Sequence, residues 1–261
     1  MTPRVTLLTD FGTADGYVAA MKGVLASMAP GAFLDDASHE VSRGDPLAAA
    51  LALERYWRLY PPGTVHLVVV DPGVGTRRRA LALEADERFV VAPDNGVVSR
   101  VVAEVHSWSA VEVAEEGGVP GIDPSSTFHG RDVFAPAAAR LAAGRPLESL
   151  GGPLADPVLL PLPEPRRDGG EAEGEVIVAD RFGNLVTNIP GSWVPPGADV
   201  EIAGRRVALL PSYGHTSPGA LLAVVNSDGR VEVAVRDGSA AAVLGVGPGE
   251  PASKTEPGNG Q

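Results

Sequence analysis

The pattern of apolar residues changes near residue 160, and this change most limits how the chain can fold. Before it, apolar runs alternate with segments of helical spacing. After it, short β-type runs are separated by turn residues. Residues 161–174 are rich in proline, glycine and charge, which is the composition of a linker. We therefore predict an N-terminal domain over residues 1–160, a C-terminal domain over 175–249 and a disordered tail over 250–261.

The N-terminal pattern predicts an α/β layer fold with a mostly parallel sheet. Residues 65–70 are mainly β-branched, contain no turn residue and are bounded by turn residues, as in a buried central strand. Asp45-Pro46 is a capping residue followed by a first-turn proline, so a helix is predicted from there to about residue 60. Further strands are predicted over residues 5–9, 80–83 and 89–92, and further helices over 16–28 and 132–143.

The C-terminal pattern predicts a small antiparallel β domain of barrel or sandwich type. No convincing helical spacing occurs in this half of the sequence. The predicted strands cover residues 176–179, 200–202, 207–210, 221–225, 231–235 and 241–244.

Composition excludes several classes of function. The chain has no cysteine, which excludes a disulfide framework, a thiolate metal centre and a cysteine nucleophile. Its 33 acidic and 21 basic residues give a net charge of -12 without a long basic run, which argues against nucleic acid as a partner. No apolar run approaches the roughly 18 residues of a membrane span, and residues 5–8 are too few for a signal-peptide core. We expect a cytoplasmic protein with no membrane partner.

Three polar segments lie where an open α/β sheet binds its ligands, just beyond strand ends or before a helix. The first carries Asp10 and Asp15 after the first strand. The second carries Asp71 and the arginines 77–79 after the most apolar strand. The third carries His129 immediately before a helix, whose N-terminus is the positive end of its dipole.

Each polar segment also has a purely structural explanation. Asp15 is equally explained as a helix cap, and at least two of the arginines 77–79 as a solvated edge. A lone histidine such as His129 is more often structural than catalytic. In the C-terminal half, Asp180 and Asn184 flank a glycine, as they would in a hairpin turn.

Five segments in register resemble the S-adenosylmethionine (SAM) hydroxide adenosyltransferase family, the SAM hydrolase branch related to the fluorinase and chlorinase. They span both predicted domains, and a weaker match is Asn-Ser-Asp-Gly at 226–229. The five are Leu-Thr-Asp-Phe-Gly (8–12), Val-Asp-Pro-Gly-Val-Gly-Thr (70–76), Pro-Asp-Asn-Gly (93–96), Thr-Phe-His-Gly-Arg-Asp (127–132) and Asp-Arg-Phe-Gly-Asn-Leu-Val-Thr-Asn (180–188).

The resemblance implies a homotrimer that binds SAM between the N-terminal domain of one subunit and the C-terminal domain of its neighbour. The family's catalytic residues fall on Asp71, Arg78 and His129, where the arginine lies seven residues after the aspartate. The family's SAM contacts fall on Asp10, Asp15, Asp180 and Asn184, and the weaker match at 226–229 adds Ser227. No metal and no cofactor are implied, since SAM is the substrate.

The implied reaction is hydrolysis of SAM to adenosine and L-methionine by attack of activated water on ribose C5′. The halogenase branch has Tyr-Pro-Ala-Thr where this chain has Asp71-Pro-Gly-Val, and a small hydroxyl residue where it has Tyr17. These departures favour the water-using branch.

Two alternatives of other classes stay open. A calcium-dependent nucleoside hydrolase has a similar opening motif, but Leu8 stands where that motif has its first aspartate. A non-catalytic SAM- or adenosine-binding protein is compatible with the same fold. A serine hydrolase is excluded because the chain lacks a Gly-x-Ser-x-Gly segment.

Overall fold

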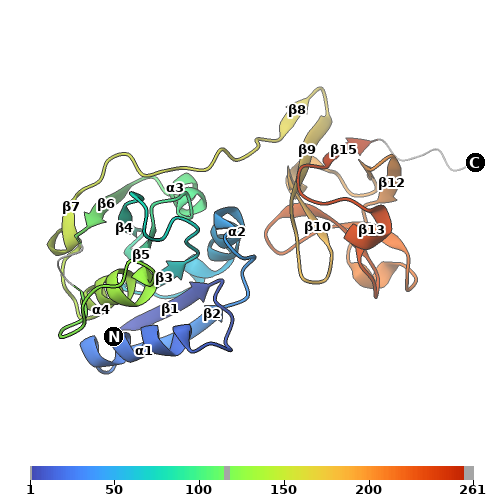
Figure 1. The fold of residues 1–261 in the computed structure, drawn as a ribbon. Coiled ribbons are helices and arrows are strands. Elements are labelled where there is room, and N and C mark those ends of the chain that lie inside the picture. The colour runs from blue at the N-terminus through green and yellow to red at the C-terminus, as the bar shows by residue number, and fades with distance from the viewer. Residues whose placement is uncertain (1, 115–117, 256–261) are drawn as a thin grey trace, which may run out of the picture. The chain divides into compact units, whose positions relative to one another are not determined.

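The computed structural model describes residues 2–114 and 118–255 of the chain. They divide into two units, one up to Leu160 and one from Pro161, which are described separately (Figure 1).

A mixed sheet organises the N-terminal unit, with seven strands among its described residues. In chain order these are β1 (Arg4–Thr9), β2 (Phe33–Ser38), β3 (Val65–Val69), β4 (Ala80–Ala85), β5 (Arg88–Pro93), β6 (Trp108–Val113) and β7 (Gly151–Pro153). Their order across the sheet is β2-β1-β3-β5-β4-β6-β7. The first four in this order are parallel, and β4, β6 and β7 pair antiparallel. The predicted α/β layer fold is confirmed, with the parallel strands on one side of the sheet.

Helices cover both faces of this sheet. α1 (Tyr17–Met28) and α4 (Ala135–Ala142) bury their apolar residues in one core cluster. α2 (Pro46–Tyr56) and α3 (Ser99–Glu104) bury theirs in another. The apolar residues of β3 are divided between the two clusters, and all five of its residues are buried, which explains why the strand has no exposed polar face. Among the described residues, no helix has the length and apolar character needed to cross a bilayer.

The helix ends follow the predicted capping residues, with two differences. The Asp45 side chain accepts a hydrogen bond from the Ala48 N–H at 3.0 Å and so caps α2. α2 ends at Tyr56 and continues only as a short 3-10 turn, so the predicted end near residue 60 was too late. The helix predicted from residue 132 begins earlier, as a π-helical turn over Gly130–Phe134 that leads into α4.

An antiparallel sheet curls into a near-closed barrel in the C-terminal unit, with eight strands among its described residues. They are β8 (Arg166–Asp168), β9 (Glu171–Ala179), β10 (Leu185–Pro190), β11 (Asp199–Ile202), β12 (Arg205–Ala208), β13 (Leu221–Val225), β14 (Arg230–Val235) and β15 (Pro251–Thr255). Their order is β12-β11-β15-β9-β10-β14-β13, with β8 beside β9. The two ends of the sheet approach where the Leu210 N–H donates to the Ala223 carbonyl at 2.8 Å. The predicted antiparallel β domain is confirmed.

Three details of the C-terminal half differ from the prediction. Residues 241–244, predicted as a strand, belong to helix α5 (Ala240–Leu244), because the Ser239 side chain caps the Ala242 N–H at 3.1 Å. The linker predicted over 161–174 contains β8 and the first residues of β9. The tail predicted from residue 250 contains β15, which pairs with β9 and β11. The rest of that tail, 256–261, lies outside the described residues.

Candidate active site

The order of the strands brings two of the predicted catalytic residues to one edge of the N-terminal sheet. Asp71 lies just beyond the carboxyl end of β3. β4 runs antiparallel to β5, and its first residue, Ala80, pairs with Pro93, the last residue of β5. Arg78 precedes β4 and therefore lies at the same edge as Asp71. This is the edge at which parallel α/β sheets bind their ligands.

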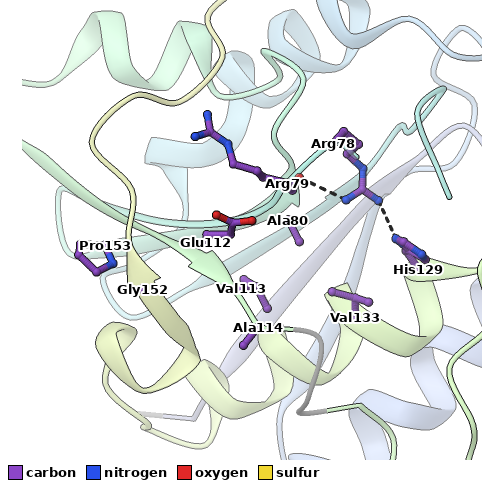
Figure 2. A pocket seen from close by; sticks show the side chains of 10 residues that line it. All are labelled: Arg78, Arg79, Ala80, Glu112, Val113, Ala114, His129, Val133, Gly152 and Pro153. Carbon is purple, nitrogen blue, oxygen red and sulfur yellow. Dashed lines mark hydrogen bonds between the residues drawn. The ribbon is translucent and has the colours of Figure 1, made fainter. Parts of the chain in front are cut away.

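Asp71, Arg78 and His129 form a continuous chain of hydrogen bonds. Arg78 Nε donates to Asp71 Oδ1 at 2.9 Å, and Nη2 donates to Oδ2 at 2.5 Å. The same Nη2 lies 3.0 Å from His129 Nδ1 (Figure 2). The side chains of Arg78 and Asp71 are only 10% and 5% exposed, so solvent screens this bidentate ion pair weakly. The structure thus brings all three predicted catalytic residues together.

Further contacts hold the Arg78 guanidinium in place. Its Cζ lies over the Phe134 ring, 4.8 Å from the centroid. Its Nη1 donates to the Arg79 carbonyl at 3.2 Å (Figure 2). A guanidinium has five N–H donors, and the contacts with Asp71, His129 and this carbonyl occupy four. Among the described residues the fifth, on Nη1, has no partner, so it can donate to a ligand or a water.

The contact with Arg78 also decides where neutral His129 carries its hydrogen. A guanidinium can only donate hydrogen bonds, so His129 Nδ1 is the acceptor. The hydrogen of the neutral ring is therefore on Nε2. In this arrangement His129 can donate from Nε2, while its Nδ1 is occupied by the contact with Arg78.

The two arginines beside Arg78 have different environments. Arg77 is exposed, as predicted for a solvated edge. Arg79 is not part of such an edge, because its Nε donates to the buried Asp94 at 2.7 Å and its Nη1 to Asp156 at 2.8 Å. The prediction that at least two of the three arginines form a solvated edge was therefore wrong for Arg79. This residue connects the start of β4 to the segment after β7.

Asp10 and Asp15 follow β1 but have different surroundings. Asp10 Oδ2 accepts a hydrogen bond from the Gly44 N–H at 2.7 Å, so this carboxylate helps to hold the loop before α2 in place. Asp15 is exposed. Gly16, with φ 75°, occupies the cap position of α1, and no side chain caps that helix. The structural explanation of Asp15 as a helix cap is therefore wrong.

Asp132 holds the segment that carries His129, and sequence reasoning did not assign it to the site. Its Oδ2 accepts the Ser125 N–H at 2.8 Å, and its Oδ1 accepts from Arg131 at 2.7 Å. Burial alone would raise the pKa of the Asp132 carboxyl, but the hydrogen bonds from Arg131 and Ser125 outweigh burial and lower that pKa. The signal was present in the sequence, because Asp132 ends the Thr-Phe-His-Gly-Arg-Asp motif.

Three aromatic rings, of which sequence reasoning named only Tyr17, connect the segments carrying Asp15 and His129. Phe11, Tyr17 and Phe128 contact one another edge-on, with centroids 5.1 to 6.2 Å apart. Tyr17 is 50% exposed, so part of this aromatic surface is open to a ligand.

The predicted binding residues of the C-terminal unit lie in two different turns. Asp180 and Asn184 belong to the turn between β9 and β10, where Asp180 Oδ1 accepts the Asn184 N–H at 2.9 Å. Ser227 belongs to the turn between β13 and β14. The register pairs Leu185 with Val233 and Pro190 with Arg230, so the two turns lie at opposite ends of the β10–β14 pair. The structure brings Asp180 and Asn184 together but not Ser227.

A buried carboxylate lies on β14 between these two turns. Glu232 is 4% exposed and accepts hydrogen bonds from Tyr213 Oη at 2.6 Å and from Asn226 Nδ2 at 3.2 Å. Burial and this hydrogen bond to Glu232 raise the pKa of the Tyr213 hydroxyl, and the charge of Asp180 adds to the shift. Tyr213 and Asn226 are thereby fixed near the predicted binding residues.

A mixed α/β unit with a polar site at its strand ends, followed by a small β-barrel unit, defines a two-domain protein of the α/β-plus-barrel class. Residues 5–151 match the SAM hydroxide adenosyltransferase N-terminal domain, and residues 174–253 match the C-terminal domain of the same family. The chain therefore belongs to the SAM hydroxide adenosyltransferase family.

Relatives of this family are similar along nearly the whole chain. Proteins named (R)-S-adenosyl-L-methionine hydrolase from Salinispora tropica and Thermus thermophilus are each 42% identical, over 95% of this chain and 96% and 97% of their own lengths. A fluorinase from an Actinoplanes species is 30% identical over 72% of each chain. A solved structure of an uncharacterized conserved protein from Thermotoga maritima superposes with a TM-score of 0.89 at 35% identity, covering 97% of this chain and 100% of that one.

Among residues 2–114 and 118–255, no group of three or more histidine or acidic side chains is arranged to hold a metal ion.

Proposed function

We propose that this protein hydrolyses SAM to adenosine and L-methionine. The observation that carries the proposal is the 42% identity over 95% of the chain to proteins named (R)-S-adenosyl-L-methionine hydrolase. The hydrogen-bonded chain of Asp71, Arg78 and His129 supports it, because its groups suit the control of a water molecule.

The difficult part of the proposed reaction is the nucleophile and not the leaving group. Water attacks C5′ of the ribose, the C5′–O bond forms and the C5′–S bond breaks. The electron pair goes to the sulfonium sulfur, which leaves as a neutral thioether and needs no general acid. One proton is released per turnover. Water is a weak nucleophile until it loses part of this proton, so the protein has to promote this partial deprotonation.

Arg78 stabilises hydroxide character in the attacking water. Its position is fixed by Asp71, His129 and the ring of Phe134, and its remaining Nη1–H is available to an oxygen. A charge held in advance in a poorly screened site stabilises a developing anion without reorganisation.

Asp71 and His129 have different proposed roles: Asp71 accepts a proton and His129 orients the water. Each oxygen of Asp71 is bonded to Arg78 and keeps a second lone pair, with which it can accept the water proton. His129 donates from Nε2 and orients the water oxygen, since its Nδ1 is occupied by Arg78. Orientation by His129 thus suits the geometry better than a proton relay through the ring.

The proposed substrate contacts match the chemistry of SAM. Carboxylates at Asp10, Asp15 and Asp180 suit a ligand that carries a sulfonium, an ammonium and ribose hydroxyls. Asn184 adds an amide, and Ser227, which lies in a different turn, adds a hydroxyl.

The assembly and the cellular location are also proposals. We propose a homotrimer in which the C-terminal unit of one subunit completes the site of its neighbour, as the resemblance to the family implies. A cytoplasmic location remains a prediction.

Quantifying products after incubation with SAM tests the proposed function. The proposal predicts equal amounts of adenosine and methionine, unchanged by a chelator. Asp71→Asn should lose most of this activity while still binding SAM, because it removes the charge that accepts the proton. Release of adenine, with loss of activity on chelation, would instead indicate the calcium-dependent nucleoside hydrolase. Binding of SAM without any product would indicate the non-catalytic binding protein.

A further inference from the structure

A cavity of about 360 Å³ reaches Arg78 and His129 from within the N-terminal unit. Arg78 and His129 lie at one end, and Gly152 and Pro153 of β7 at the other (Figure 2). Asp10, Asp15 and Asp71 are not among the residues that line it. The cavity therefore leads to the arginine and the histidine without passing the carboxylates expected to contact the substrate. We call it the β7 pocket.

The charges around the β7 pocket argue for a neutral polar occupant. Arg78 and Arg79 line it, but both are already paired, the first with Asp71 and the second with Asp94 and Asp156. The remaining charge is the carboxylate of Glu112, which disfavours an anion. The two guanidinium groups in turn disfavour a cation. The volume has room for several waters at about 30 Å³ each.

Hydrolysis needs a path for water and protons, because each turnover consumes one water and releases one proton. We propose that the β7 pocket is the water channel of the active site, through which water reaches Arg78 and His129 and the released proton returns to solvent. This inference rests on the proposed SAM hydrolysis and adds to it the path of the second substrate. The water supplies the oxygen of the new C5′–O bond. Its proton, first accepted by Asp71, passes to the next water that enters beside Arg78 and leaves along the waters in the pocket.

Filling the pocket from its far end tests the proposal without touching the catalytic groups. A Cβ added at Gly152 meets no atom within 4 Å, and the glycine has no left-handed backbone conformation, so Gly152→Leu adds a side chain without straining the backbone. Ala114, exposed and also lining the pocket, gives a second variant, Ala114→Leu. The matched control is Gly23→Leu on α1, where an added Cβ also meets nothing within 4 Å and which does not line the β7 pocket.

The expected result is a loss of kcat with little change in substrate affinity. Both pocket variants should lower kcat for adenosine formation by about fivefold or more, with KM for SAM within about twofold of wild type. The ratio of kcat in H2O to kcat in D2O should change, because delivery of water or release of the proton, and not the attack on C5′, then limits turnover. Gly23→Leu should match the wild type in all three quantities. No variant should unfold at a lower temperature than the wild type, and Gly23→Leu should unfold at a slightly higher one because it removes a glycine from a helix interior.

Three results would contradict the proposal that the β7 pocket is a water channel. Unchanged kcat in both pocket variants would mean that water reaches the site elsewhere. A raised KM with unchanged kcat would mean that the pocket holds part of SAM. A lowered kcat with an unchanged isotope ratio would mean that the substitutions distort the catalytic residues. If the wild type itself formed no adenosine, the proposed function would fail, which is a different outcome from any of these.

Discussion

Arg78 is the residue on which the proposed chemistry depends, because it contacts both other members of the catalytic set. Its bidentate contact with Asp71 and its contact with His129 need a planar fork of donors at fixed spacing. Lysine carries the same charge but presents it as a single point on a flexible chain. The geometry of the guanidinium, and not its charge alone, should therefore matter.

Arg78→Lys is predicted to lower kcat by about 10²- to 10³-fold, the loss typical when one aligned donor to a developing anion is removed. The matched control is Arg77→Lys, one residue away, exposed and without a role in the site. Steady-state kinetics with SAM checks both variants. Equal activity of Arg78→Lys and Arg77→Lys would show that fixed geometry is unimportant.

Two substitutions of His129 test which of its two ring nitrogens contributes to catalysis. Gln places an N–H donor near the position of Nε2, whereas Asn places an acceptor near the position of Nδ1. Because we assign the catalytic contribution to donation from Nε2, His129→Gln should keep more activity than His129→Asn or His129→Ala. All three should still bind SAM. If Asn proved the better substitute in adenosine assays, the assigned orientation of the ring would be reversed.

Individual residues were predictable where a motif marked them. The spacing of seven residues from Asp71 selected Arg78 among three arginines, and the hydrogen bonds agree with that choice. The pairing of Arg79 with Asp94 and Asp156 was not predictable, because Asp156 is 77 positions away in the sequence. Contacts over such a separation depend on how the strands are ordered, which local patterns do not contain.

At the scale of elements, β3 carries a buried histidine whose protonation opposes folding. His66 is fully buried, its Nδ1 lies 2.9 Å from Thr6 Oγ1, and the rings of Tyr56 and Tyr60 pack against it. Burial lowers the pKa of His66 from 6.5 to about 3. In the unfolded chain the same ring would bind a proton below its ordinary pKa, so protons favour unfolding between about pH 6.5 and pH 3.

The free energy of unfolding is predicted to fall by about 2 kcal/mol between about pH 7 and pH 5 from His66 alone. His66→Asn keeps a polar atom near Nδ1 and removes the titration, so this part of the pH dependence should disappear. Denaturant unfolding at both pH values and a fixed protein concentration checks this, with exposed His106→Asn as the control. An unchanged pH slope in His66→Asn would contradict burial of a neutral ring.

Elements were predictable where the apolar period and a cap agreed. α2 shows both signals and begins where the sequence predicts it, and the apolar character of β3 together with its flanking turn residues was enough to place that strand. α5 was missed because its five residues are too few to show a helical period, although Ser239 is a capping residue. β15 was missed because its pairing with β9 and β11 joins distant segments, which no local pattern reveals.

At the scale of the whole molecule, the proposed assembly divides each active site between two subunits. The change of pattern near residue 160 was enough to separate an α/β unit from a β-barrel unit, since each has its own periodicity. Association of copies depends on surface complementarity, which periodicity does not encode.

Mixing two inactive variants tests the shared site. Asp71→Asn is altered in the N-terminal unit and Asp180→Ala in the C-terminal unit. In trimers formed at random from equal amounts of both, about one quarter of the sites would combine two unaltered units, so about one quarter of wild-type activity should return. Co-expressed subunits, with the molecular mass measured by light scattering, give this fraction. No recovered activity in verified mixed oligomers would contradict a site shared between subunits.

The central claim is that water attacks C5′ of SAM, and isotope labelling tests it most directly. In water enriched in oxygen-18, mass spectrometry of the adenosine formed should show one labelled oxygen, located in the 5′-hydroxyl. The methionine should carry no label. Unlabelled adenosine, or a label found only elsewhere in the products, would contradict attack of water on C5′.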